Sequence, residues 1–152
     1  MNFNVVSFME DNYLTEGPVS SDRILSFIEK MKESKDEGGH SIFLGQVRED
    51  NNEGKTVKAI EYSAYKGMVN KEADRIIADI MAEFGDIKDI SILHSTGIVK
   101  TGEISLLIMV SAGHRHQAIN GCAKAVELVK ERLPVWKREI YEDNSHTWKE
   151  NA

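Results

Sequence analysis

Three stretches of the chain carry apolar residues at the spacing of one helical face. Over residues 69–84 the apolar positions recur every three or four residues, and Gly85 follows the last of them. The same spacing over residues 115–132 predicts a second helix, which Pro134 ends because the residue before a proline avoids helical backbone. A shorter stripe predicts a further helix from about residue 22 to 32.

Short apolar or alternating segments between these helices predict strands. They lie at residues 4–8, 41–47, 57–65, 90–93, 103–111 and 135–141. Gly97 and Gly102 predict a turn region before the fifth strand, and the polar residues 48–56 predict a loop long enough to be functional. The order, about βαββαββαβ, indicates an α+β fold with a mixed or antiparallel sheet and packed helices. We expect one domain over residues 1–152.

Composition narrows the class of protein. The chain has 152 residues, of which 41% are apolar and 29% charged, so it is long enough to bury an ordinary core and too apolar to be disordered. Its one cysteine, Cys122, excludes an internal disulfide framework and a multi-cysteine metal site. Because Cys122 falls on the apolar face of a predicted helix, we interpret it as a small core residue.

No segment has the pattern of a membrane span or a secretory signal. The longest apolar run, residues 106–110, is far shorter than the ~20 residues that a membrane helix needs. The start of the chain lacks a basic segment and carries Glu10 and Asp11 early. We therefore expect a soluble cytoplasmic protein that does not contact a membrane.

The charge is unevenly distributed. The whole chain carries a net charge of −6, which disfavours a general nucleic-acid binder. Residues 114–138 contain six basic and two acidic residues, so this segment is +4 and the remainder is −10. Such a segment is either a solvated helix face or the wall of a pocket for a small anion, and charge alone does not decide between them.

Lys130 and Lys137 are the first candidates for chemistry. Lys130 lies in the last turn of a predicted helix and Lys137 in the strand after Pro134, which folds the chain back between them. Two neighbouring, partly buried ammonium groups lower each other's pKa and produce a base, acid or nucleophile near neutral pH. The plainer alternative is that Lys130 only stabilises the helix dipole.

A second candidate site lies where the strongest strand meets the third helix. His114 and Arg115 there suit a phosphate or carboxylate, although an exposed polar turn has the same composition. His114 and His116 have no placed third ligand, so we expect no metal. Arg48 follows a predicted strand and is either a solvated charge or the rim of a site. Trp136 is most simply a packing residue.

Five stretches, in this order and spacing, resemble one family, the large catalytic subunit of molybdopterin synthase. The most specific is the last, because it places a proline, a tryptophan and two lysines at set distances. The resemblance covers about residues 38–148, and residues 1–37 offer only a plausible strand and helix. The stretches are FLGQVR at 43–48, YSAYKGM at 62–68, HSTGIVKTGE at 94–103, HRHQA at 114–118 and KERLPVWKRE at 130–139.

The resemblance implies a sulfur-transferring enzyme of molybdenum cofactor biosynthesis. Such proteins convert a cyclic pyranopterin monophosphate into molybdopterin by adding two sulfurs that form a dithiolene. The sulfur arrives as a thiocarboxylate on the C-terminal Gly-Gly of a small ubiquitin-like subunit. Two large subunits form a homodimer at the centre of a heterotetramer. The implied fold is α+β, of the α/β-hammerhead type, with no cofactor of its own.

The resemblance also implies roles for particular residues. Lys130 matches the lysine beside the incoming thiocarboxylate, and Lys137 its companion in the active site. Arg48, His114 and Arg115 match positions that bind the substrate, where arginines suit phosphate and pterin oxygens. Some relatives carry an arginine near the C-terminus that reaches the active site of the dimer mate. This chain has Lys149 in that region, and whether it does the same is left open.

Two other readings of the residues remain. One is a non-catalytic α+β module that binds a small anion, for which Lys130 and Lys137 are replaceable and no ubiquitin-like partner exists. The other is an enzyme that forms a Schiff base on a lysine, which borohydride would trap. Neither explains Arg48 and the His114–Arg115 pair together with both lysines.

Overall fold

The computed structural model describes residues 13–149, so the strand expected at residues 4–8 lies outside the described part. The described part has three helices, α2 (Ser21–Met31), α3 (Lys66–Glu83) and α4 (Arg115–Arg132). It also has eight strands, namely β1 (Leu14–Glu16), β2 (Gly39–Gln46), β3 (Asn51–Asn52), β4 (Lys55–Ala64), β5 (Ile87–Lys100), β6 (Ile104–Ala112), β7 (Val135–Tyr141) and β8 (His146–Lys149). The expected α+β class is confirmed.

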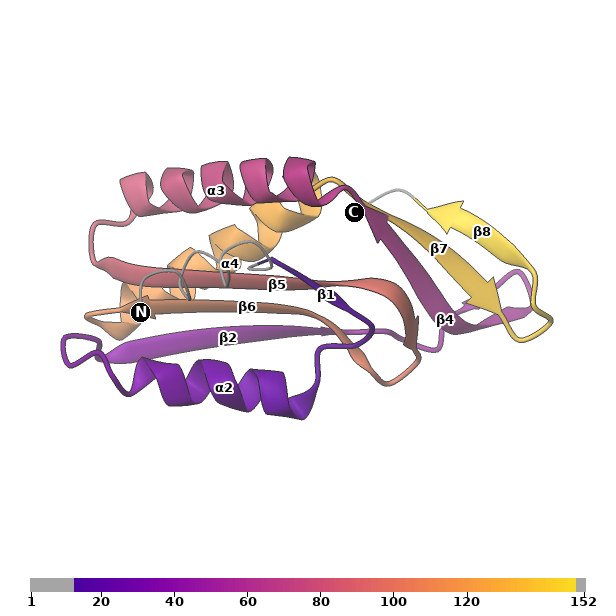
Figure 1. Cartoon of the computed structure of the whole chain (residues 1–152), viewed down its shortest axis with the longest axis horizontal. Coiled ribbons are helices and arrows are strands. Elements are labelled where there is room, and N and C mark those ends of the chain that lie inside the picture. Colours follow the sequence, from indigo (N-terminus) through magenta and orange to yellow (C-terminus); the bar gives the residue numbers. More distant parts are fainter. Residues whose placement is uncertain (1–12, 150–152) are drawn as a thin grey trace.

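The strands form one mixed sheet in the order β2-β6-β5-β4-β7-β8. All neighbours along this path are antiparallel, while β1 pairs with β5 in parallel and β3 pairs with β4. Figure 1 shows β4, β7 and β8 extending beyond the helices at one end of the molecule. The sheet therefore has a part covered by helices and a part that projects from it.

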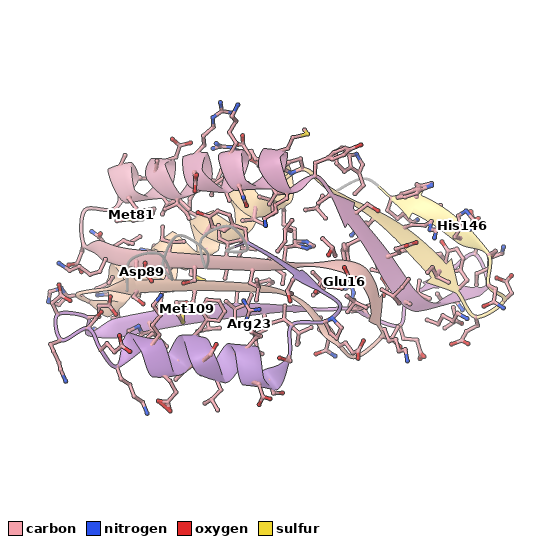
Figure 2. The ribbon with its side chains drawn as sticks, viewed as in Figure 1. Glu16, Arg23, Met81, Asp89, Met109 and His146 are labelled. Carbon is pink, nitrogen blue, oxygen red and sulfur yellow. The ribbon has the colours of Figure 1, made fainter. Side chains whose placement is uncertain are left out.

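The helices cover both faces of the main part of the sheet. Alternate residues of β6 belong to two separate cores, because successive side chains of a strand point to opposite faces. Leu106, Ile108 and Val110 pack with α3 and α4, whereas Leu107 and Met109 pack with α2. Met109 is labelled beside α2 in Figure 2. Because both of its faces are covered, β6 is buried along almost its whole length, which explains why its sequence is almost continuously apolar.

The prediction of a turn at Gly97 is wrong, because this residue lies within a strand. β5 is 14 residues long and runs through Gly97. It pairs with β6 before this residue and with β4 from Gly97 onward. Gly97 has φ +78°, and a Cβ there would lie 2.6 Å from the Glu16 carboxylate, so glycine allows the strand to bend between its two partners. The turn into β6 is made at Gly102, whose φ is +88°.

Besides β1, which no pattern predicted, two more short strands escaped the sequence pattern. The expected loop at 48–56 contains β3, which forms a tight hairpin with β4 through Glu53 and Gly54, both at positive φ. β8 has the polar sequence HTWK and pairs only with β7. Neither segment has an apolar alternation, because neither buries a face.

Trp136 is not the packing residue that was expected, because 47% of it is exposed. In β7 it alternates with Val135, which is buried in the core, and with Lys137, so its side chain lies on the opposite face of the strand from theirs. Cys122 is buried in the core, as expected, and burial raises the pKa of its thiol. Within residues 13–149 no helix has the length and apolarity to cross a bilayer.

Candidate active site

Pro134 brings Lys130 and Lys137 to one cavity. α4 ends at Arg132, and Leu133 takes an extended conformation with φ −70° and ψ 123° before the proline. The chain then turns back into β7, where Lys137 lies opposite Tyr62 of β4. Both lysines line a cavity of about 20 Å³, which is room for about one water. Its other lining residues are Tyr62, His94, Ser105, Leu106, Val129 and Leu133.

Lys130 has the electrostatic setting that was predicted for it. Burial lowers the pKa of its ammonium, and the positive charge of Lys137 lowers it further. Both effects disfavour the charged form, so more of the neutral amine is present near neutral pH than for an exposed lysine. A lysine of this kind can move a proton or attack a carbonyl carbon.

His94 of β5 lies in the same cavity, and sequence reasoning did not single it out as a site residue. It is 7% exposed. Burial, together with the charges of Lys130 and Lys137, lowers its pKa to about 4, so the ring is neutral at pH 7. Its Nδ1 lies 2.8 Å from the main-chain oxygen of Ser95. The available signal was a histidine within an otherwise apolar strand pattern, which a buried polar site would explain.

Tyr62 and Ser105 complete the polar wall of the cavity. The Tyr62 hydroxyl donates a hydrogen bond of 3.1 Å to Ser105 Oγ, which joins β4 to β6. Burial raises the pKa of the Tyr62 phenol, so it is a neutral donor at physiological pH. The Tyr62 and His94 rings meet edge to face, with centroids 5.0 Å apart and planes at 77°.

Arg48 lies outside the lining of this cavity. Its side chain is 81% exposed and its nearest charged partner is Asp50, at 3.4 Å. The preceding residue, Val47, donates its N–H to the main-chain oxygen of Glu103, which comes just before β6. Arg48 is therefore on the same end of the sheet as Ser105, but its guanidinium points into solvent.

His114 and Arg115 lie at the opposite end of α4 from Lys130. Fifteen residues separate Arg115 from Lys130 along one helix, which corresponds to about 22 Å. The N–H of His114 donates to Asp86 Oδ2 at 2.8 Å, and the ring Nδ1 lies 3.1 Å from the same oxygen. Burial of the Asp86 carboxylate acts to raise its pKa. The contacts with His114 outweigh burial and hold this pKa below its ordinary value. Within one chain, His114 and Arg115 therefore lie far from the cavity that Lys130 lines.

Lys149 lies beside Lys137 within its own chain. It is the β8 residue opposite Lys137, and its ammonium is 3.6 Å from the buried carboxylate of Glu139. His114 and His116 are both exposed. Among residues 13–149 no group of three or more histidine, cysteine, aspartate or glutamate side chains is arranged to hold a metal ion.

The chain matches one family model and several curated proteins. The model of the MoaE protein matches residues 14–132. The molybdopterin synthase catalytic subunit of Drosophila pseudoobscura pseudoobscura is 43% identical over 116 residues, which are 76% of this chain and 32% of the relative. That of Drosophila willistoni is 44% identical over 115 residues, 75% of this chain and 31% of the relative. The chain thus spans about a third of the length of these curated relatives.

Solved structures share the fold over nearly the whole chain. The molybdopterin synthase from Staphylococcus aureus is 30% identical, with a TM-score of 0.78 over 91% of this chain and 96% of that one. A complex of subunits 1 and 2 of molybdopterin-converting factor from Helicobacter pylori contains a chain with a TM-score of 0.75. That chain is 18% identical, and the match covers 90% of this chain and 88% of that one. The second likeness concerns the fold alone.

Proposed function

The chain belongs to the MoaE protein family, and from this premise we propose that it is the catalytic subunit of a molybdopterin synthase. In this proposal it transfers sulfur to a cyclic pyranopterin monophosphate and so forms the dithiolene of molybdopterin. The donor is the C-terminal thiocarboxylate of a small ubiquitin-like subunit. Each donor that loses its sulfur leaves as a carboxylate, with an oxygen taken from water. We place the reaction in the cytoplasm.

The observation that carries the proposal is the pair of lysines on one small cavity. Thiocarboxylate and phosphate are both anions, and Lys130 and Lys137 supply a positive site in a chain whose net charge is −6. Lys137 is suited to stabilise negative charge that develops during sulfur transfer. Lys130, whose pKa is lowered by burial and by Lys137, is suited to move a proton near neutral pH.

We further propose that the complete site is shared between two copies of the chain. Arg48, His114 and Arg115 would bind the phosphate and pterin oxygens of the substrate. Because His114 and Arg115 lie a helix length from Lys130, the second copy of a homodimer would supply them. The solved complex of two molybdopterin-converting factor subunits supports a small partner as well, and together these give a heterotetramer.

A single-turnover assay tests the proposal. The purified chain, the precursor and the thiocarboxylated small subunit are mixed, and the dithiolene product is measured by mass spectrometry. We expect product from the wild type and a large loss in Lys130→Ala and Lys137→Ala. Lys124→Ala is the matched control, because this lysine lies on the same helix but is exposed and 3.9 Å from Glu83. It should retain wild-type activity.

A folded wild-type chain that forms no product and does not bind the small subunit would contradict the proposal. That result would favour a non-catalytic module for a small anion. Equal losses in Lys124→Ala and Lys130→Ala would also count against it, because the effect would then be one of general charge and not of the cavity.

A further inference from the structure

Asp86 contacts the start of α4 through both its main chain and its side chain. It lies in the connection between α3 and β5, directly before β5 begins at Ile87. Its N–H donates to Gln117 Oε1 at 2.7 Å, and its carbonyl oxygen accepts from the N–H of Gly113 at 3.1 Å. Its carboxylate accepts from the N–H of His114 at 2.8 Å. The main-chain contacts therefore fix the place of this carboxylate beside α4.

Gly113 allows the carboxylate to come close to α4. A Cβ at this position would lie 2.5 Å from Asp86 Oδ1, so a side chain here would push the carboxylate away. Among residues 13–149 no hydrogen bond is formed to Oδ1, and both contacts with His114 are made by Oδ2. One oxygen of Asp86 thus packs against Gly113 while the other serves His114.

The same oxygen fixes the ring of His114. Although burial acts to raise the pKa of Asp86, the contacts with His114 hold it below its ordinary value, so the carboxylate is ionised at pH 7. An ionised carboxylate only accepts hydrogen bonds. Nδ1 of the ring, 3.1 Å from Oδ2, therefore carries a proton, and Nε2 is the nitrogen left for a ligand.

This contact orders a side chain that would otherwise rotate. The His114 side chain is 86% exposed, and that of Asp86 is 27% exposed, so the ring projects into solvent from a partly buried anchor. Anchoring α4 requires only the contact with the His114 N–H. The contact with Nδ1 is not needed for that, but it determines where the ring points. A ring ordered in advance binds a ligand about threefold to tenfold more tightly than one that must be ordered on binding.

We propose that Asp86 is a positioning residue for substrate binding, which holds the His114 ring so that Nε2 is turned away from the carboxylate and toward the substrate. This role in binding rests on the proposed function above, in which His114 contacts the pterin phosphate. The contact between Asp86 and the ring does not rest on it and is testable without substrate. The family resemblance implied no role for Asp86.

Three variants of the full chain separate the ring contact from the fold. Asp86→Ala removes the acceptor. Asp86→Asn keeps one oxygen, which can take the place of Oδ2 and accept from both N–H groups of His114. Asp89→Ala is the matched control, because this exposed carboxylate of β5, labelled in Figure 2, lies three residues away. Single-turnover sulfur transfer is measured for each across a series of precursor concentrations. The series yields the rate constant at saturation and the precursor concentration that gives half of it.

We expect Asp86→Ala to raise the half-saturating precursor concentration about threefold to tenfold, the cost of ordering one side chain, with a saturated rate constant near that of the wild type. Asp86→Asn and Asp89→Ala should match the wild type in both quantities. In chains that already carry His114→Ala, Asp86→Ala should have no further effect, because it acts through the ring.

A merely structural role for Asp86 predicts losses that add to those of His114→Ala. Additive losses, or an Asp86→Asn chain that binds precursor as weakly as Asp86→Ala, would overturn the inference. A loss in Asp89→Ala as large as that in Asp86→Ala would overturn it too, because the effect would then be one of general charge.

The wild type supplies a check that does not depend on how the variants fold. A long-range proton–nitrogen correlation spectrum at pH 8 reports which ring nitrogen of His114 carries a proton. Nδ1 should carry one, and a ring protonated on Nε2 alone would overturn the inference. If the wild type transfers no sulfur, the proposed function fails, while the spectrum still decides whether Asp86 holds the ring.

Discussion

Acidification should destabilise this protein through one buried imidazole, that of His94. Burial, followed by the charges of Lys130 and Lys137, lowers its pKa from 6.5 to about 4 in the folded chain. In the unfolded chain the ring has its ordinary pKa of about 6.5. Between these values the unfolded chain binds a proton that the folded chain excludes. The free energy of unfolding therefore falls as the pH falls from about 6.5 to about 4.

The size of this effect follows from the difference between the two pKa values. A difference of about 2.5 pKa units corresponds to about 3 kcal/mol, since each unit is worth about 1.4 kcal/mol. The ring is 7% exposed, so solvent screening removes little of it. At pH 4.5 about 2.5 kcal/mol of the loss has occurred. A typical domain has only about 5–15 kcal/mol of stability, so this one group is a large share.

Urea unfolding at pH 7 and pH 4.5, at one protein concentration, measures the loss. Carboxylates also titrate in this range, so the comparison is between the falls in wild type and in His94→Gln. The fall should be about 2.5 kcal/mol smaller in the variant. His146→Gln, which removes an exposed histidine labelled in Figure 2, should keep the wild-type fall. Equal falls in wild type and His94→Gln would refute the reasoning.

Two further predictions concern the second copy and the packing of α4. Mixing Lys130→Ala with Arg115→Ala chains should recover about a quarter of wild-type activity, because half of the dimers are mixed and each holds one intact site; no recovery would show that the two residues serve one chain. Arg132→Met should cost about 1–2 kcal/mol in urea unfolding. Its guanidinium donates to two α3 carboxylates at 2.6 and 2.7 Å, although these groups are partly exposed. Arg75→Met is the control, since its single exposed contact of 3.4 Å should contribute under about 0.5 kcal/mol. Equal losses of stability in Arg132→Met and Arg75→Met would contradict a stabilising role for the contacts between Arg132 and α3.

Local sequence patterns were sufficient to predict a helix or strand where one face of the element is buried and a breaker residue marks its end. The helix at residues 115–132 and the strand at 135–141 were both predicted with the bounds that the structure has. Apolar periodicity defined the helix, and Pro134 forced the chain out of helical backbone after it. The same proline allowed the meeting of Lys130 and Lys137 to be predicted, because the reversal is a local event.

Such local patterns did not predict which strands pair with one another. Gly97 has the local signature of a turn, yet β5 runs through it because β6 and β4 each supply hydrogen-bonding partners on either side of the bend. The polar strand β8 exists because β7 offers it an edge. Trp136 was predicted to be a packing residue, but 47% of it is exposed. At Gly97 the deciding partner β4 is distant in the sequence, whereas β8 pairs with its neighbour β7 across a short turn without any apolar alternation that would mark it as a strand.

The amino-acid sequence by itself determined the α+β class, the helices, the lysine pair and its positive setting in an acidic chain. Only the tertiary structure decided that His94 joins this pair, and that His114 and Arg115 lie about 22 Å from it along α4. The physical reason is that periodicity and proline act between neighbours in the chain. A cavity, in contrast, is made by β4, β5, β6, β7 and α4 together, and its burial and charge exist only once all of them have packed.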